Sequence, residues 1–248
     1  MQKRNIGIIT HYGVHNHGAQ LQLFALLSIL RGKGFSAHAL QFEKDYRYMG
    51  GDAKNKYSIS VKSISVYVKY LFANGWRKTL FNVQKKRIFD KFRKNNDILG
   101  ERYEDFTGNL AIIGSDEVFS FETGVTGAFW GVNSKAKKLV SYAASFGPTT
   151  LQEIKEKQLE NYVSAGLKRF SSLSVRDNNS EEIIKAISGI ESVKNCDPVI
   201  FYGYQKEIDE YANSVKINSP YILLYSYDNN MNSSQDIMIV MNVAENKK

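Results

Sequence analysis

The sequence predicts an α/β protein whose Rossmann-like parallel sheet is flanked by helices. Residues 5–10 form a short apolar run that is typical of a buried strand. Residues 19–30 then carry leucines at helical spacing, and residues 36–42 form a second apolar run. A strand, a helix and a strand in this order make the βαβ unit of a parallel sheet, whose crossover is right-handed.

The same alternation of strands and helices resumes after residue 109. A long amphipathic helix is expected at 151–170, and another helix at 179–187, with Asn or Ser as its N-cap and Gly189 at its end. Short apolar runs predict four further strands, at residues 110–114, 137–147, 171–177 and 193–201.

Residues 43–109 follow a less regular pattern. They predict a loop at 46–51 and helices at 63–71 and 79–94, the second of which is strongly basic. The basic side of such a helix is most often simply exposed to solvent. A functional version would lie on the anionic inner leaflet of a membrane or meet a diphosphate-bearing acceptor. No helix-turn-helix, RNP or zinc pattern accompanies the basic residues, so we expect no nucleic-acid partner.

Two domains are expected. Residues 1–203 would form an N-terminal Rossmann-like domain, and residues 204–248 begin with a linker helix. A strand at 221–228 and a helix from Ser233 follow. One strand and one helix cannot bury their own apolar faces. Either these elements return to the first sheet, or residues 204–248 are the start of a second α/β domain that is truncated. We favour the second interpretation.

The composition is that of a globular protein, with 43% hydrophobic and 23% charged residues. No run is long or apolar enough for a membrane span or a signal peptide, so a cytoplasmic location is expected. Cys196 is the only cysteine, which excludes an intramolecular disulfide, and we expect it to be a small buried thiol rather than a nucleophile. The net charge of +8 favours anionic partners.

Polar segments rich in small residues follow several of the predicted strands. Parallel sheets bind ligands at the carboxyl ends of their strands, beside the starts of helices. We therefore expect the candidate site to combine four segments, at residues 11–19, 114–119, 141–147 and 174–177.

The segment at 16–19 (NHGA) precedes the first helix, whose free N–H groups and dipole favour an anion or a carboxylate. The alternative is an ordinary Asn N-cap and a tight turn. The segment matches neither G-x-G-x-x-G nor a Walker loop. His11, His15 and His17 have no acidic residue or cysteine beside them, so no metal site is expected.

Two further strand ends carry charged side chains. Asp116 and Glu117 could supply a general base, although Asp116 could equally cap the next helix or turn. The Arg176 guanidinium could hold a phosphate or carboxylate with two hydrogen bonds. Its alternative is an ion pair with Asp177 or another neighbour.

Taken in order, six segments resemble the polysaccharide pyruvyl transferase family. They are IGIITHYGVHNHGAQLQLFALLSILRGKGF, AIIGSDEVF, KKLVSYAASFG, FSSLSVRDNNS, CDPVIF and YILLYSYD, and the match is poor only at 43–109. The resemblance implies a GT-B-like architecture with the cleft between two α/β domains, of which this chain holds the N-terminal half. It also implies transfer of a pyruvyl group from phosphoenolpyruvate to a sugar of an exopolysaccharide or cell-wall polymer, giving a ketal and phosphate.

Individual motifs of the family match positions of this sequence and imply its site residues. The family's S-V-R-D/E motif matches Arg176, which would bind the phosphate or carboxylate of the donor. Its N-Y-G-A turn matches 16–19 with His17 in place of Tyr, and its G-S-D-Q-V-W motif matches 114–119 with Glu117 for Gln and Phe119 for Trp. The catalytic residues implied are Asp116 and Arg176. The substrate-binding residues expected are Asn16, His17, Gly18, Ala19, Gly114, Ser115, Glu117, Ser141, Tyr142 and Ser145.

The resemblance also implies the partners: phosphoenolpyruvate as donor without a separate cofactor, and a saccharide or lipid-linked oligosaccharide as acceptor. A peripheral contact with an anionic membrane, at its inner face, would fit the basic helix. The general acid is expected in the second domain. Two alternatives stay open, a GT-B-type glycosyltransferase that uses a nucleotide sugar and a non-catalytic saccharide-binding remnant.

Overall fold

The computed structural model describes residues 4–45, 64–122, 124–212 and 214. The chain divides into two compact units, Met1–Tyr204 and Gln205–Lys248. In the second unit the described helix is α8 (Gln205–Ala212), which lies where the sequence predicts a linker helix. The loop predicted at 46–51, the strand at 221–228 and the helix from Ser233 lie outside the described residues.

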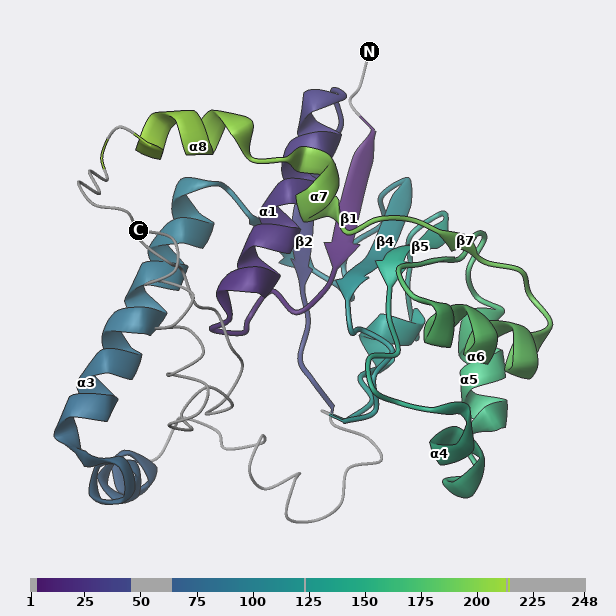
Figure 1. Cartoon of the computed structure of the whole chain (residues 1–248), viewed down its shortest axis with the longest axis horizontal. Helices are drawn as coiled ribbons and strands as arrows, with labels where there is room; N and C mark the ends of the chain where they lie inside the picture. The colour runs from purple at the N-terminus through teal and green to yellow at the C-terminus, as the bar shows by residue number, and fades with distance from the viewer. Residues whose placement is uncertain (1–3, 46–63, 123, 213, 215–248) are drawn as a thin grey trace, which may run out of the picture. The chain divides into compact units, whose positions relative to one another are not determined.

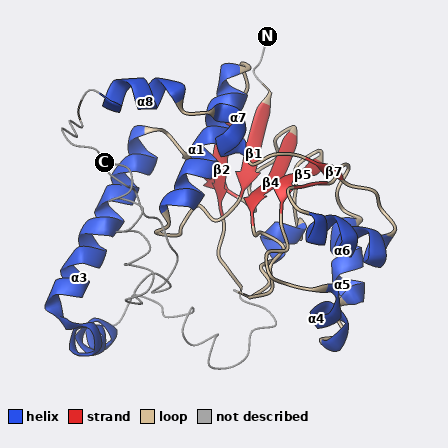
Figure 2. Ribbon diagram, in the orientation of Figure 1, coloured by secondary structure: helices blue, strands red, loops and turns tan. Residues whose placement is uncertain are grey.

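A parallel sheet forms the centre of the first unit and confirms the α/β prediction (Figures 1 and 2). In its described part the strands follow the order β3-β2-β1-β4-β5-β6-β7. Each neighbouring pair is parallel. The strands are β1 (Asn5–Ile9), β2 (Ser36–Gln41), β3 (Leu99–Arg102), β4 (Leu110–Asp116), β5 (Leu139–Ala144), β6 (Ser174–Val175) and β7 (Val193–Lys194).

Helices cover both faces of this sheet. Successive strand residues point to opposite faces, so Ile8 packs with Leu23 on one side and Ile9 joins the aromatic cluster on the other. The first side is covered by α1, and the second by η1, α5 and α6. The helices of this unit are α1 (His17–Gly32), α3 (Ile64–Asn95), η1 (Gly127–Trp130), α4 (Leu151–Glu156), α5 (Glu160–Leu167), α6 (Asn178–Ser188) and α7 (Pro198–Tyr202).

Trp130 is the largest side chain at the centre of the aromatic cluster and is 1% exposed. Its ring lies 4.8 Å from that of Phe119 and 6.0 Å from that of Phe146. Gly166 of α5 lies against the indole, where a Cβ atom would come within 2.4 Å of Trp130 Cε3. The absence of a side chain at Gly166 thus lets α5 approach the sheet closely.

Three sequence predictions were wrong in detail. The helix expected at 151–170 is interrupted between α4 and α5, where Gln158 has φ +55° and Leu159 turns into the core. Residues 193–201 are not one strand: β7 ends at Lys194, and α7 begins at Pro198. The N-cap of α6 is Asp177, whose side chain accepts a hydrogen bond from Ser180 N, rather than Asn or Ser.

The helices predicted at 63–71 and 79–94 belong to one helix, α3, from residue 64 onward. A strand that the sequence did not predict, β3, follows it and pairs with β2 at the sheet edge. Among the helices of the described residues, none is both long enough and apolar enough to cross a membrane.

Candidate functional site

The carboxyl ends of neighbouring strands bring distant residues to one edge of the sheet. Because β1, β4, β5 and β6 are parallel and adjacent, residues after each strand share this edge. Asp116 ends β4 and Arg176 follows β6, and the structure places them 3.6 Å apart, from Asp116 Oδ1 to Arg176 Nη2. The strand ends that the sequence singled out therefore meet.

Arg176 lies among three carboxylates. Its Nη1 group donates a hydrogen bond of 3.3 Å to Asp197, and its Nη2 atom lies 3.8 Å from Glu117 Oε1. The expected partner Asp177 instead caps α6. The contacts to Asp116 and Glu117 are too long for hydrogen bonds. Within the described chain, the guanidinium therefore makes one hydrogen bond, to Asp197, and two longer ion-pair contacts.

The two adjacent carboxylates differ in their surroundings. Burial and the neighbouring charge of Asp116 raise the pKa of Glu117, and Arg176 counteracts them. Asp116 has φ +101°, which is strained for a residue with a side chain. Its carbonyl oxygen accepts hydrogen bonds from Val118 N and Ser145 N, which hold the turn. Strained residues of this kind concentrate at functional sites.

Gly114 permits this turn. Its φ is +109°, and a Cβ atom there would lie 2.4 Å from the carbonyl oxygen of Tyr142 on β5. A side chain at this position would push β4 and β5 apart. Gly114 therefore supports the geometry of Asp116 through the backbone.

The serines and the tyrosine of the candidate set are engaged within the protein. The Ser141 hydroxyl donates to Ser174 O and accepts from Ser174 N, which joins β5 to β6. Ser145 accepts from Gly147 N, and Tyr142 donates to the carbonyl oxygen of Cys196. Ser115 differs, because its Oγ is buried without a hydrogen-bond partner in the described residues.

The start of α1 contacts α3. Asn16 is the N-cap and accepts from Ala19 N at 3.2 Å, and Gly18 lies in the first turn. The His17 ring lies 4.9 Å from the ring of Phe89, and His15 stacks on the same ring at 5.8 Å. In the described structure no hydrogen bond or ion pair joins the segment at 16–19 to Arg176. One turn further along α1, however, Gln22 donates to Asp197.

The three histidines of the first loop do not converge. His11 packs edge-on against Phe129 at 4.8 Å, whereas His15 and His17 lie on Phe89. Searched over the ranges that the structure describes, no three His, Cys, Asp or Glu side chains are placed to hold a metal ion.

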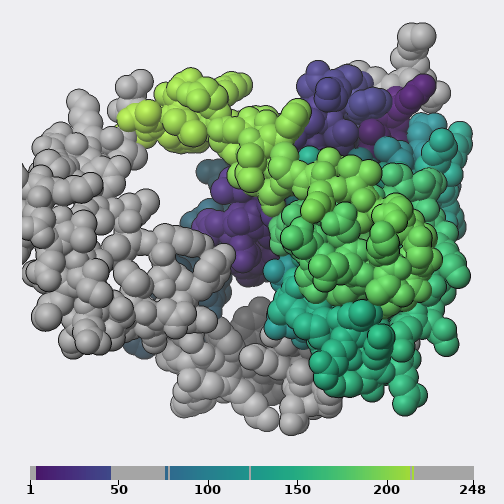
Figure 3. All heavy atoms as spheres, turned by 45° about the vertical axis from the view of Figure 1, so that its right-hand side comes forward, coloured from purple at the N-terminus to yellow at the C-terminus, as the bar shows by residue number. Residues whose placement is uncertain are grey.

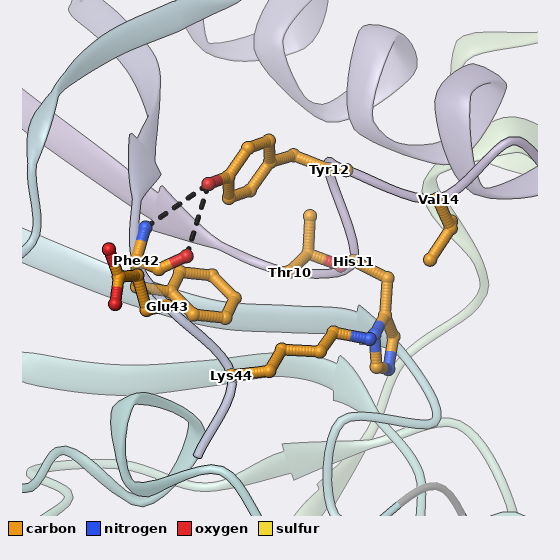
Figure 4. A pocket seen from close by; sticks show the side chains of 8 residues that line it. Thr10, His11, Tyr12, Val14, Phe42, Glu43 and Lys44 are labelled. Carbon is orange, nitrogen blue, oxygen red and sulfur yellow. Dashed lines mark hydrogen bonds between the residues drawn. The ribbon is translucent and has the colours of Figure 1, made fainter. Parts of the chain in front are cut away.

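Sequence reasoning missed Lys44 and Asp197 as members of the site. Lys44 follows β2 and, with His11, lines a cavity of about 320 Å³ (Figure 4). Burial lowers the pKa of His11 to about 4, with Lys44 as the next cause, while Asp116 opposes the shift. Burial also lowers the pKa of Lys44, again against Asp116. One sequence feature could have identified Lys44, because it directly follows the strand predicted at residues 36–42.

Asp197 lies in the sequence Cys196-Asp197-Pro198. Its Oδ1 accepts from Val199 N at 2.9 Å, and Pro198 takes the first helical position, so an Asp-Pro helix start was readable in the sequence. Figure 3 shows α7 lying against α1. Cys196 is exposed, which corrects the expectation of a buried thiol.

Comparison with known proteins places the chain in a family. The family model described as polysaccharide pyruvyl transferase matches residues 16–248, nearly the whole sequence. No curated protein and no solved structure matches the chain. Together with the sheet and its polar carboxyl edge, this match identifies the chain as a member of the polysaccharide pyruvyl transferase family.

Proposed function

We propose that this protein transfers a pyruvyl group from phosphoenolpyruvate to a pair of hydroxyls on a sugar of an exopolysaccharide or cell-wall polymer. The observation that supports this best is the Arg176 cluster. A guanidinium that makes one hydrogen bond within the described chain lies beside Asp116 and Glu117 at the carboxyl edge of the sheet. Guanidinium groups bind phosphate and carboxylate oxygens with two parallel hydrogen bonds, and phosphoenolpyruvate carries both groups.

The proposed reaction has two additions. One sugar hydroxyl adds to C2 of the donor and loses its proton, while the methylene carbon takes up a proton, so the C=C bond is replaced by one C–O and one C–H bond. Phosphate then leaves, and the second hydroxyl attacks the resulting oxocarbenium centre and loses its proton. In this scheme Arg176 holds the donor and stabilises the charge of the leaving phosphate. Asp116, 3.6 Å from Arg176, orients an acceptor hydroxyl or receives its proton.

The decisive experiment measures phosphoenolpyruvate binding to the full chain by calorimetry. We expect Arg176→Gln to weaken binding at least tenfold, because charge-assisted hydrogen bonds contribute about 1.5–3 kcal/mol. Arg102→Gln is the matched control, since Arg102 is exposed on the edge strand β3 and pairs with Glu104. Equal affinities in Arg176→Gln and Arg102→Gln would contradict the donor assignment. Binding of a nucleotide sugar in place of phosphoenolpyruvate would favour a glycosyltransferase.

We also propose a peripheral contact between α3 and an anionic membrane. Trp76, Phe81 and Ile88 of this helix are each more than 60% exposed. Basic side chains interleave with them, and Arg77 lies 5.3 Å from the Trp76 ring. Exposed aromatic and aliphatic side chains beside lysines and arginines are typical of helices that lie in a membrane interface. Such a contact would bring the site to lipid-linked acceptors.

A further inference from the structure

The cavity lined by His11 and Lys44 lies between the carboxyl ends of β1 and β2. Its walls are formed by residues 10–14 on one side and 42–44 on the other (Figure 4). Its volume of about 320 Å³ falls at the small end of the range for ligand pockets. Residues 11–14 belong to the segment at 11–19 that the sequence placed in the candidate site. None of the residues expected to be catalytic or substrate-binding lines the cavity, so its ligand is unassigned.

His11 presents a hydrogen-bond acceptor to this cavity. Its Nε2 atom lies 3.5 Å from the carbonyl oxygen of Glu117, which can only accept, so this contact favours the tautomer with hydrogen on Nε2. Burial keeps the ring neutral by lowering the pKa of His11 to about 4. Nδ1 therefore holds a lone pair. It is buried and has no hydrogen-bond partner in the described part of the chain.

Lys44 presents donors to the same space. Its ammonium group points toward the imidazole of His11, whereas the Glu43 carboxylate points away (Figure 4). No hydrogen bond joins Lys44 to any residue that the structure describes. Asp116 favours the charged form of Lys44, and Lys44 in turn disfavours protonation of His11. A donor and an acceptor thus line the same cavity, and neither has a hydrogen-bond partner among the described residues.

The remaining walls are fixed. The Tyr12 hydroxyl exchanges hydrogen bonds of 3.2 Å with the backbone of Phe42, and the two rings pack edge to face with centroids 5.4 Å apart. Tyr12 is therefore held as a wall and does not compete for the Lys44 ammonium group. An aromatic wall beside a few polar groups is the usual make-up of a small-molecule site.

We propose that this cavity binds the acceptor sugar, with one hydroxyl bridging Lys44 and His11. The hydroxyl oxygen accepts a hydrogen bond from Lys44 Nζ, and its hydrogen is donated to His11 Nδ1. An ionised carboxylate and the dianion of a phosphate monoester have no hydrogen to donate to Nδ1, and an apolar group would leave both partners unpaired. A hydroxyl, which donates and accepts at once, satisfies both.

This inference rests on the proposed function and refines it. Asp116 favours the charged form of Lys44 and lies 3.6 Å from Arg176, so one carboxylate interacts with both the cavity lysine and the donor cluster. Asp116 would therefore act on the acceptor hydroxyl and on the donor. The segment at 16–19, which packs on α3, would then contribute less to acceptor binding than the sequence suggested.

Nitrogen-15 NMR of the full chain with labelled histidine tests the proposal directly. The chain has four histidines, and the His11 signal is the one lost in His11→Phe. The probes are methyl β-D-glucopyranoside, methyl β-D-galactopyranoside and methyl β-D-mannopyranoside, with sulfate, an anion that only accepts hydrogen bonds, as the comparison. We expect the free protein to show a neutral His11 with hydrogen on Nε2, and a glycoside to move the Nδ1 signal toward that of a hydrogen-bonded nitrogen.

Variants separate this binding from a general effect. Lys44→Met should weaken glycoside binding at least tenfold, while Lys33→Met, an exposed position at the end of α1, should leave it unchanged. The proposal is overturned if no glycoside moves the His11 signal, if sulfate alone does, or if hydrogen resides on Nδ1. Phosphoenolpyruvate binding is measured in the same variants. If it persists in Lys44→Met but is lost in Arg176→Gln, the donor assignment holds even where the acceptor proposal is overturned.

Discussion

Asp197 accepts a hydrogen bond of 3.3 Å from Arg176 and thereby joins the end of β6 to the first turn of α7. Gln22 of α1 donates to the same carboxylate oxygen. One side chain thus connects three elements and also fixes the guanidinium that we assign to the donor.

Replacing Asp197 should separate its two roles. Asp197→Ala removes both the cap of α7 and the partner of Arg176, and we expect a loss of about 1–3 kcal/mol in the free energy of unfolding. Asp197→Asn retains a capping side chain and should lose less. Urea denaturation measures both. Glu191→Ala, which breaks an exposed pair with Lys185, should change stability by less than about 0.5 kcal/mol. Equal losses in Ala and Asn variants would contradict a capping role.

His11 should make stability depend on pH. Burial and Lys44 lower the pKa of His11 from 6.5 to about 4, so the unfolded chain takes up this proton at a higher pH than the native protein does. The neutral His11 ring therefore contributes to the free energy of unfolding. This contribution, on the order of 3 kcal/mol, is fully present above pH 6.5 and is lost as pH falls toward 4. His11→Phe keeps a ring against Phe129. Between pH 7 and 4, the free energy of unfolding of this variant should fall less than that of the unmodified protein. An identical slope would show that His11 titrates normally.

Gly166→Ala should destabilise the protein although alanine favours helices. The new Cβ would lie 2.4 Å from Trp130 in a closely packed core, and overpacking of this kind costs about 1–3 kcal/mol. Gly32→Ala is the matched control at the end of α1, where a new methyl group would meet nothing within 4 Å. That variant should be neutral or slightly more stable. Thermal unfolding distinguishes the two, and equal melting temperatures would argue against the tight contact.

The membrane proposal has an intrinsic fluorescent reporter. The sequence contains two tryptophans, of which Trp130 is buried and Trp76 is 66% exposed on α3. Vesicles with phosphatidylglycerol should shift the emission to shorter wavelength, and phosphatidylcholine vesicles should shift it less. High salt should weaken the response because it screens the attraction. A Trp76→Phe variant removes the signal, and a spectrum unchanged by anionic vesicles would contradict the contact.

Strong local patterns made much of the fold readable. The apolar runs of β1, β2, β4 and β5 and the leucine spacing of α1 correspond to elements in the structure. Gly189 closes α6 with φ +68°, as a glycine C-cap does. These elements carry their own signals, because burial on both faces of a parallel sheet demands continuous apolar residues.

The missed features depend on tertiary contacts. The four residues of β3 (LGER) are half polar and become a strand only by pairing with β2 at the sheet edge. The break after α4 is set by packing of Leu159 with the core, not by a glycine or proline. Lys44 gains its surroundings from His11 and Asp116, which come from other strands. No local pattern could reveal that cluster.

The strand order also bears on how the chain emerges during synthesis. Ile6 of β1 pairs with Ala37 of β2 soon after both are made, but its other neighbour is Leu110 of β4. At translation rates of about 5–20 residues per second, β1 waits on the order of 4–15 s after β2 is made, with the N–H and C=O groups of its other edge unpaired. Backbone pairing over such a separation slows folding. Nascent chains that end before β4 should therefore bind chaperones and aggregate, and those extended past β5 should not.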